Sequence, residues 1–452
     1  MPYTHANYLQ FRRHLASRLG DAGNVFYSDA ELSLYVIEGL RTWQAMTGYW
    51  RDRGSFNTSN ATAFYDLSAV LQTGLYDYNV KDQDLASVMQ YHLLEPANNW
   101  NISKTWAGTD MFVMSDLTNA LQRRRDQFLK DAGVVLTNAT IFPPPPSSGR
   151  VVLGDTVIDI RRLAWKDSSS NYVSPLFRST EFSFDAFQPG WSMNPGQVPL
   201  EYSVAAAPPL AIQLAPSPLS SGSLDLAGVN AGTVLDVSVG VLMGIPDNFS
   251  WVVKWGALAD LFSRDGQSSD PFRAAYCQQR YDDGVLLARS ASSVLHAQID
   301  GQDIQTESLY DLDVYNPPWQ TGTGSPKIMA IAGLNLVALG PVPDATGYSV
   351  VVDVIRNAAL PALDADYLQL GREELDAVLD YCEHIASLKM GGEEFQSTIP
   401  LYQRFVQAAS IYNDRLKSSV VYIEAMGQLS QREGSRNQRR QSDSTLRASL
   451  GG

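Results

Sequence analysis

The N-terminal third of the chain alternates hydrophobic and polar positions with the period of amphipathic helices. Tyr8, Phe11 and Leu15 recur at spacings of three and four residues, which places them on one helix face. Ser28 and Glu31 form a capping box, in which the serine accepts from the amide of residue 31 and the glutamate reaches back. Further helical patterns cover residues 68–78, 84–94 and 115–133. We therefore expect this whole region to be helical.

The pattern changes abruptly after Phe142. Four prolines followed by Ser-Ser-Gly cannot form a helix and mark a boundary. The following segments, bounded by Pro, Gly and Asn, have β-type patterns: 151–153, 157–164, 202–205, 211–214 and 224–227. Helical periodicity returns after Pro246, with Trp251, Trp255 and Phe262 on one face. These patterns predict an antiparallel β-domain followed by a helical hairpin.

Three short motifs then recur at a nearly constant offset. They are Asp185–Trp191 with Asp313–Trp319 (offset 128), Ala215–Pro218 with Gly340–Pro343 (offset 125), and Ala259–Leu261 with Ala386–Leu388 (offset 127). In each copy short strands lead to a helix, a turn that contains glycine, and a second helix. Recurrence in the same order indicates an internal duplication.

The predicted fold class is therefore α+β. We expect a helical bundle, built from N-terminal, middle and C-terminal helices, that carries two inserted antiparallel β-domains from the duplication. The expected regions are an N-terminal helical region (1–142), a first β-domain (143–245), a helical hairpin (246–297), a second β-domain (298–369), C-terminal helices (370–427) and a flexible basic tail (428–452).

Composition narrows the classes of function. The 452 residues are 44% hydrophobic and only 18% charged, which excludes a disordered polyelectrolyte. A net charge of −14 argues against a protein that coats nucleic acid, although DNA could slide past such a surface without adhering. The tail has the opposite sign, with Arg432, Arg436, Arg439, Arg440 and Arg447 against Glu433 and Asp443. We expect it to become ordered only on a partner.

The cysteines and the N-terminus bear on the cellular compartment. Cys277 and Cys382 are too few for a disulfide framework and match no metal-ligand spacing, so buried thiols in a reducing compartment are expected. The first residues lack the apolar core of a signal peptide, and nowhere do 18 apolar residues run together. Synthesis in the cytosol is the resulting expectation.

Two clusters could in principle bind metal ions. His92 and Glu95 lie on one helix face, as a ligand pair would, but a solvated face is the favoured interpretation. Asp77, Asn79, Asp82 and Asp84 gather oxygen ligands suited to Ca²⁺. They lack the central glycine and the closing glutamate of a calcium loop, so acids at a helix start are favoured. We expect no metal and no other cofactor.

Catalytic motifs are also absent from the sequence. It contains no Gly-x-Ser-x-Gly elbow, no phosphate-binding loop and no dinucleotide fingerprint. The adjacent acids Glu373–Glu374 and Glu393–Glu394 would point apart on a helix, and the first pair begins one. The chain is therefore expected not to be an enzyme, with no catalytic residues to name.

The order of these segments resembles a known family. The sequence runs from a Ser-Asp-x-Glu-Leu helix start to a strand region, a Pro-Ser-Pro turn and a Trp-rich helix pair: Ser28–Leu32, Val157–Asp167, Tyr202–Val204, Ile212–Pro218, Trp255–Gly266 and Ala274–Tyr281. It is similar to the head-to-tail adaptor (neck, connector or collar) proteins of tailed bacteriophages. The second β-plus-hairpin copy and the segment from Trp50 to Asp110 depart from the simpler adaptors.

The resemblance implies a structural virion protein, made in the bacterial cytoplasm. Such proteins form homo-oligomeric rings, usually dodecamers, that join the capsid portal to the tail nozzle or the next neck protein and let DNA pass. Their C-terminal extension inserts into the portal, which would make Arg432, Arg436, Arg439 and Arg440 the portal-binding residues of this chain. A lumen of like charge would lower adhesion of the passing genome.

Two alternatives come from other classes. A virion-associated peptidoglycan hydrolase would need a general acid in a cleft, for which Glu95 and Glu201 are the nameable residues. A carbohydrate- or receptor-binding tail module would use exposed aromatic side chains, for which Trp191 and Trp319 are the candidates. A shared packing role in the two β-domains is the simpler interpretation of these tryptophans.

Overall fold

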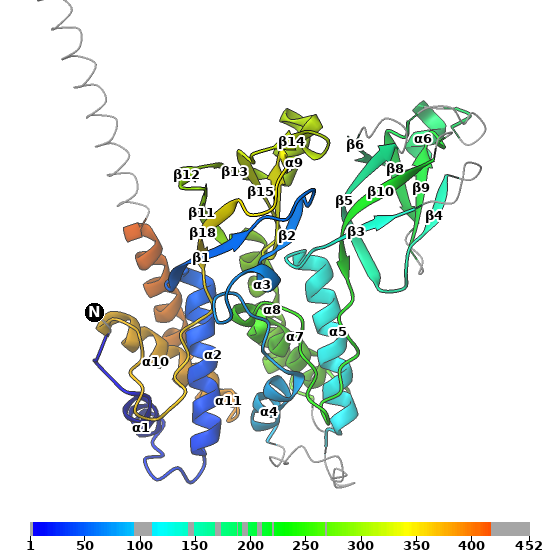
Figure 1. Cartoon of the computed structure of the whole chain (residues 1–452). Helices are drawn as coiled ribbons and strands as arrows, with labels where there is room; N and C mark the ends of the chain where they lie inside the picture. The colour runs from blue at the N-terminus through cyan, green and yellow to red at the C-terminus, as the bar shows by residue number, and fades with distance from the viewer. Residues whose placement is uncertain are drawn as a thin grey trace, which may run out of the picture.

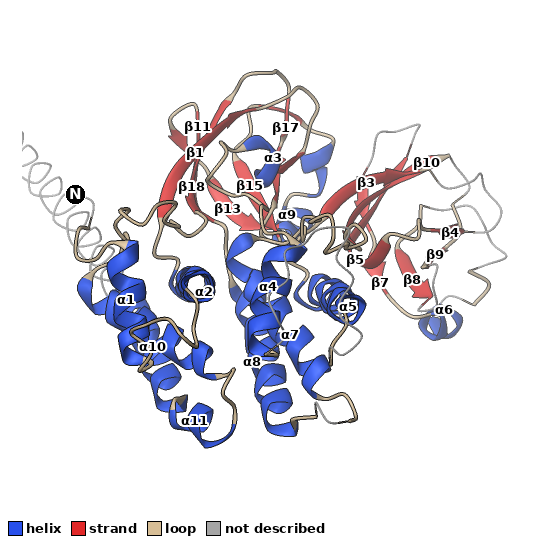
Figure 2. Cartoon of the chain, turned by 90° about the horizontal axis from the view of Figure 1, so that it is seen from below, coloured by secondary structure: helices blue, strands red, loops and turns tan. Residues whose placement is uncertain are grey.

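The computed structural model describes residues 3–94, 111–142, 149–167, 173–187, 189–191, 198–205, 210–218, 221–266 and 269–416. Its architecture is α+β: helices form one layer, and two β-domains lie on the same side of that layer (Figures 1 and 2). Within the described ranges, none of the helices has the length and apolar character needed to cross a membrane.

The fold consists of two units, one nested inside the other in the sequence. We name residues 82–290 the inner unit. Its larger helices are α4 (Asp82–His92), α5 (Met114–Ala132), α7 (Ser250–Phe262) and α8 (Pro271–Ser290), with the short helices α6 (Glu181–Phe187) and η1 (Asp247–Phe249). Its strands are β3 (Thr137–Ile141), β4 (Arg150–Val152), β5 (Val157–Asp167), β6 (Val173–Pro175), β7 (Phe177–Arg178), β8 (Glu201–Ala205), β9 (Ala211–Ala215) and β10 (Gly222–Asn230).

The outer unit is built from residues 8–66 and 294–416, and α3 (Leu67–Val70) begins the connection to the inner unit. Its helices are α1 (Tyr8–Arg18), α2 (Asp29–Thr47), α9 (Leu309–Tyr315), η2 (Pro317–Gln320), α10 (Arg372–Ser387), α11 (Gly392–Ser397) and a last helix over 399–416. Its strands are β1 (Arg51–Asn57), β2 (Phe64–Asp66), β11 (Val294–Ile299), β12 (Gln302–Asp303), β13 (Gln305–Ser308), β14 (Thr323–Gly324), β15 (Ile328–Ala332), β16 (Leu336–Gly340), β17 (Val342–Pro343) and β18 (Ser349–Ile355).

The two β-domains share one topology. Sheet β3-β10-β5-β6 of the inner unit has the same order as β1-β18-β11-β12 of the outer unit, and β4-β9-β8-β7 has the same order as β2-β16-β15-β13. The pairing is mainly antiparallel, as expected, but each β-domain contains a parallel pair at the same place: β7–β8 in the inner domain and β13–β15 in the outer one. The small β14–β17 pair is also parallel. The bonds Ala215–Pro216 and Gly340–Pro341, at matching places after β9 and β16, are both cis.

The helices of the two units also correspond. Helices α1 and α4 each have 11 residues, and α2 and α5 each have 19. Both long helices end at a glycine in the left-handed region, Gly48 (φ 55°) and Gly133 (φ 62°), a backbone conformation that disfavours other residues. Helix α2 packs on α10 as α5 packs on α7. The correspondence therefore extends into the N-terminal region, beyond the motifs that recur in the sequence.

The prediction that the N-terminal region is wholly helical is wrong at β1, β2 and β3. Strand β1 lies at the edge of its sheet, paired only with β18, and its sequence RDRGSFN buries just Gly54 and Phe56. Such a strand has no hydrophobic alternation to reveal it. The helix expected over 68–78 ends at Val70, because the chain turns through Gly74 (φ 91°) while the Asp77 carboxylate accepts from the Gly74 amide.

One of the two hydrogen bonds of the capping box predicted at the start of α2 is present. Ser28 Oγ accepts from the Glu31 amide at 3.2 Å, so the cap is confirmed. The Glu31 carboxylate does not reach back, because it is buried with Lys389 Nζ at 3.0 Å and the Tyr35 hydroxyl at 2.7 Å. A buried ion pair thus takes the place of the reciprocal half of the capping box.

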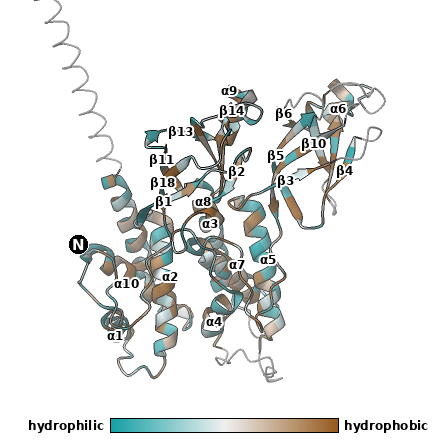
Figure 3. Ribbon diagram, in the orientation of Figure 1, coloured by the Kyte–Doolittle hydropathy of each residue, from teal (hydrophilic) through white to brown (hydrophobic). Residues whose placement is uncertain are grey.

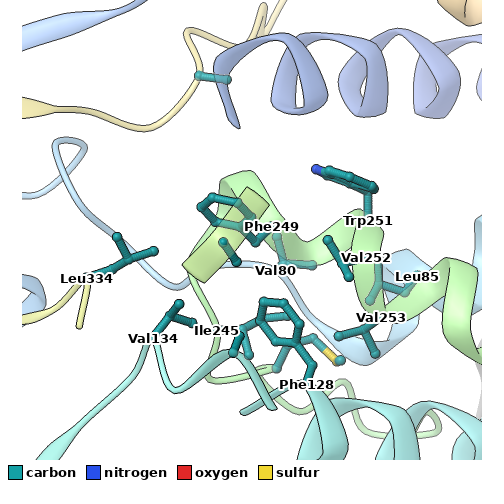
Figure 4. Packing of buried hydrophobic residues seen from close by; sticks show 14 of the residues in the cluster. Val80, Leu85, Phe128, Val134, Ile245, Phe249, Trp251, Val252, Val253 and Leu334 are labelled. Carbon is teal, nitrogen blue, oxygen red and sulfur yellow. The ribbon is translucent and has the colours of Figure 1, made fainter. Parts of the chain in front are cut away.

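The hydrophobic core is not shared equally between the β-domains. One continuous cluster covers the helices of both units and the outer β-domain, whereas the inner β-domain has its own cluster around Trp165, Ile212 and Leu224. Figure 4 shows the centre of the large cluster, where Leu334 of the outer unit lies beside Val134 and other inner-unit residues. The outer β-domain therefore shares its hydrophobic core with the helices, and the inner one is a lobe with a separate core.

Candidate functional site

Most residues predicted to carry function fall in two groups, those outside the described ranges and those with structural partners. Arg432, Arg436, Arg439 and Arg440 lie outside the described residues, as does Glu95. Glu201 is half-buried at the start of β8, paired with Ala215 of β9.

The acidic cluster at the start of α4 binds backbone amides. The Asp82 carboxylate accepts from the amides of Asp236 at 2.9 Å and Val241 at 2.8 Å, and Asp84 accepts from the Lys81 amide at 2.9 Å. Burial raises the pKa of Asp82, while these amides oppose the shift. Across the described ranges, no three His, Cys, Asp or Glu residues are arranged to hold a metal ion. The helix-start interpretation therefore accounts for these acids.

The remaining candidates also match their structural interpretations. Glu373 and Glu374 lie in the first turn of α10, and Glu393 and Glu394 lie in the first turn of α11. Cys277 and Cys382 are free and buried, and burial raises the pKa of both thiols. A protonated, enclosed thiol is a poor nucleophile.

A buried polar cluster joins the helices of the two units, and we name it the helix joint. Its centre is an ion pair in which Lys254 Nζ of α7 donates to Glu38 Oε1 and Oε2 of α2, at 2.7 and 2.5 Å. Both side chains are at least 94% buried. Burial lowers the pKa of Lys254, and Glu38 opposes that shift. The Tyr381 hydroxyl of α10 donates to Glu38 Oε1 at 3.2 Å.

Helix α8 completes the helix joint. Arg280 donates to the hydroxyls of Tyr381, at 3.0 Å, and of Tyr402 in the last helix. The Tyr276 hydroxyl lies 2.6 Å from His384 Nε2 of α10. Burial, with the nearby Arg280 charge, lowers the pKa of His384 to about 3, so its ring is neutral at pH 7. Inner-unit cations thus meet outer-unit acceptors throughout this joint.

His92, considered above as a metal ligand, belongs to the same region. Its ring stacks between Tyr35 of the outer unit and Trp255 of the inner unit, with centroids 5.3 and 5.9 Å away. Burial, followed by the charge of Lys254, holds the pKa of His92 well below its usual value. His92 is an enclosed neutral ring, so the prediction that it lies on a solvated helix face is wrong. Helix α2 covers the face of α4 that carries His92.

A second contact, the β joint, connects the two β-domains. Arg162 of β5 donates to Asp313 of α9 through Nε at 2.6 Å and Nη2 at 2.8 Å. Its other side reaches Asp225 Oδ2 at 3.1 Å, and Gln320 also bonds both Arg162 and Asp225. The Arg162 side chain is only 8% exposed. This two-pronged geometry fixes the inner β-domain against the outer one.

The two candidate tryptophans make the same hydrogen bond in different surroundings. The Nε1 atoms of Trp191 and Trp319 donate to Asp185 and Asp313, six residues earlier, both at 2.9 Å. Trp319 is 4% exposed and lies under Arg162 of the β joint, so it is not a sugar platform. Trp191 is half-buried against Phe184, and Asp185 is exposed.

Two grooves at matching places on the units also differ, because one is covered within the chain and the other is open. The α4–α7 groove of the inner unit is filled by Leu34, Ile37 and Glu38 of α2, which leaves a cavity of about 30 Å³ beside Leu85 and Trp251. The groove at the matching place on the outer unit, between α1 and α10, has an open volume of about 510 Å³. Its lining includes Gln10, Phe11, His14, Asp376 and Leu379.

The residues of both joints were not among the predicted site residues. Lys254 had a signal, because it is a lone charge inside the apolar run WVVKWGALADLF, and a helix that is apolar on all sides is buried. Arg162 had only a weak one, since charged residues on strands are usually exposed.

Comparisons with known proteins add no family. No family model matches the chain, and no curated protein matches it. Functional inference therefore depends on the two units, their joints and their exposed counterparts.

Proposed function

We propose that this chain is a structural protein of the neck of a tailed bacteriophage, a ring that connects the capsid portal to the tail and lets DNA pass. One observation carries the proposal: two units of the same topology lie side by side in the same orientation, with helices on one side and β-domains on the other (Figure 1). Side-by-side contact in one sense is heterologous, and heterologous contacts that close make rings.

The two units are, on this proposal, copies produced by an internal duplication. Support comes from the shared sheet orders, the matched helix lengths, and the Asp–Trp hydrogen bond at the same place after α6 and α9. The copies are nested rather than in tandem, because α1, α2, β1 and β2 of the outer unit precede the whole inner unit. An adaptor module with a helical base and a β-domain then occurs twice in each chain.

The proposed partners come from the resemblance to head-to-tail adaptor proteins. Copies of the chain bind one another in a dodecameric ring of adaptor modules, with the portal protein on one side and the tail nozzle or next neck protein on the other. The basic tail, through Arg432, Arg436, Arg439 and Arg440, binds an acidic groove of the portal. The acidic body, with a net charge of −14 for the whole chain, keeps passing DNA from adhering to the lumen.

The test is binding of the purified full chain to the portal protein encoded in the same genome, followed by negative-stain imaging. A ring seated on the portal is expected. Replacing the four tail arginines with glutamine should weaken portal binding at least tenfold, and replacing them with lysine should weaken it less. A chain that stays monomeric and does not bind the portal would refute the proposal.

A further inference from the structure

Each joint is formed by one surface of the outer unit and one surface of the inner unit. The equivalent surfaces at the two outer sides of the molecule have no partner among the described residues. Figure 2 shows α1 and α10 at one side of the helix layer, α5 at the other, and α2, α4, α7 and α8 between them. Within the chain, α2 of the outer unit packs on α4, α7 and α8 of the inner unit. The corresponding elements, α5 on one side and α1 with α10 on the other, have no such neighbour among the described residues.

The groove comparison makes this specific. Helices α4 and α1 start at residues 82 and 8, so Leu85 and Val88 of the filled groove correspond to Phe11 and His14 of the open one. Helices α2 and α5 start at residues 29 and 114, so Glu38 of the filling helix corresponds to Arg123. The free groove thus has a matching free helix on the opposite side of the same chain.

The β-domains show the same asymmetry. In β5 the residue before Arg162 forms a bulge against β10, and in β11 the residue before His296 forms the corresponding bulge against β18. His296 is therefore the counterpart of Arg162, but its side chain is 43% exposed where that of Arg162 is 8% exposed. Asp185, the counterpart of Asp313, is exposed as well. The outer unit thus presents a partly exposed imidazole, which lies 3.3 Å from Asp303, and the inner unit an exposed carboxylate.

We infer that the chain assembles head to tail with copies of itself by repeating its own internal contact. Helix α5 of one chain fills the α1–α10 groove of the next, with Arg123 near Asp376, and Asp185 of one chain meets His296 of the next. A second copy is the occupant because each free surface matches a surface that this chain already covers. The inference deepens the proposed function, and states that each chain supplies two positions of the ring.

The character of the free faces suits contacts made after folding. The exposed residues of α5 are polar, namely Ser115, Asn119, Arg123, Gln127 and Lys130, and much of α5 is teal in Figure 3. The open groove contains His14, Arg372 and Asp376 beside Phe11. By contrast, α2 places Leu34 and Ile37 in the filled groove. A chain that exists alone before assembly keeps its outer faces polar, whereas its internal contact can bury apolar side chains such as Leu34 and Ile37.

Cross-linking tests the contact directly. Because Cys277 and Cys382 are buried, cysteines introduced at Asp185 and His296 are the reactive thiols. With a short bismaleimide, the double variant D185C/H296C should give a ladder of dimers, trimers and higher species, since every chain carries both ends. Each single variant should stay uncross-linked. A cross-linked dimer from either single variant, or no ladder from the double variant, would overturn the inference.

Charge reversal tests the helix contact. Arg123→Glu should reduce assembly at least tenfold, because it faces Asp376, and the double variant R123E/D376R should restore it. Glu393→Arg, an exposed charge on α11, is the matched control and should leave assembly unchanged. Thermal melts of each variant exclude misfolding. Assembly of Arg123→Glu equal to that of the wild type would contradict the inference.

Counting separates this inference from the proposed function. Native mass spectrometry gives the number of chains in the ring. Class averages should show twice as many lobes around the ring, one for each unit of each chain, so a ring with twelve positions would take six chains. A ring with two lobes per chain that ignores the portal would refute the neck function and leave the inference intact. A portal-bound ring with one lobe per chain would do the reverse.

Discussion

The β-domains of the two units contain the same Asp–Trp hydrogen bond, once covered and once open. In the outer unit, Trp319 and Asp313 are enclosed by Arg162, which arrives from the other β-domain. In the inner unit, Trp191 and Asp185 make a bond of the same 2.9 Å length with Asp185 exposed. The local geometry therefore forms with or without a cover, so it is set by the turn after the short helix.

Enclosure by a neighbouring part of the chain determines how much each hydrogen-bonded or ion pair contributes to the free energy of unfolding. A hydrogen bond to a charged group is stronger when water is excluded, and a buried charge that loses its partner is costly. Residues of the joints should therefore be sensitive to substitution in the isolated chain, and their exposed counterparts should not. This contrast leads to three measurements.

The largest effect is expected in the helix joint. Glu38→Gln leaves Lys254 buried without a counter-charge and should lower the free energy of unfolding by about 3–5 kcal/mol. The counterpart change Arg123→Gln removes one exposed partner of Asp260 and should cost less than about 0.5 kcal/mol. Urea unfolding followed by circular dichroism measures both. In the double variant E38L/K254M most of the loss should be recovered, since no unpaired charge remains.

The next effect depends on pH. The pKa of His384 is about 3 in the folded chain and near 6.5 in the unfolded chain, so the unfolded state binds more protons below pH 6.5. Stability is therefore lost as the pH falls, by about 2 kcal/mol between pH 7 and pH 5 for this histidine alone.

Two variants isolate this contribution. His384→Gln should reduce the dependence between pH 7 and pH 5 and leave the part that comes from buried His92, although it also lowers stability at pH 7. Asn119→Ala, a change of an exposed side chain that does not titrate, should leave the slope of the wild type unchanged. Denaturant titrations at the two pH values supply the measurement, and equal slopes for His384→Gln and the wild type would show that His384 does not titrate as described.

The smallest effect concerns the tryptophans themselves. Trp319→Phe removes a buried hydrogen bond to a carboxylate and should cost about 2 kcal/mol. Trp191→Phe removes the same bond beside an exposed aspartate and should cost less than about 1 kcal/mol. Equal costs for the two changes would mean that the cover by Arg162 adds nothing. In an assembled ring, the difference between the two variants should shrink.

How far the sequence determines the fold can be judged from individual elements. Helices with a clear apolar face and a terminal glycine, such as α5, and strands of the inner β-domain, such as β5 and β9, were predicted within a few residues. Strand β1 was not, because a polar edge strand forms only when β18 offers its backbone. Its partner lies about 300 residues away, and no local pattern encodes such a pairing.

The site was harder to predict for a related reason. Glu38 and Arg162 look like ordinary surface charges when taken singly, and each is buried because an element from the other unit covers it. Lys254 differs in that its apolar neighbours in the sequence indicate burial, but they do not name its partner. The recurrence of Asp and Trp at a constant offset did indicate that the β-domains correspond. It could not show that one Asp–Trp pair is enclosed and the other open, because the cover comes from elsewhere in the chain.

The nesting of the units also sets an order of events during synthesis. Strand β1 leaves the ribosome nearly 300 residues before β18, an interval of roughly 15–60 s at typical rates of translation. In that time the inner unit is completed, while residues 8–66 wait with an unpaired strand edge. The charges of RDRGSFN, which hid this strand from pattern analysis, are those that discourage a waiting edge from pairing with the wrong chain.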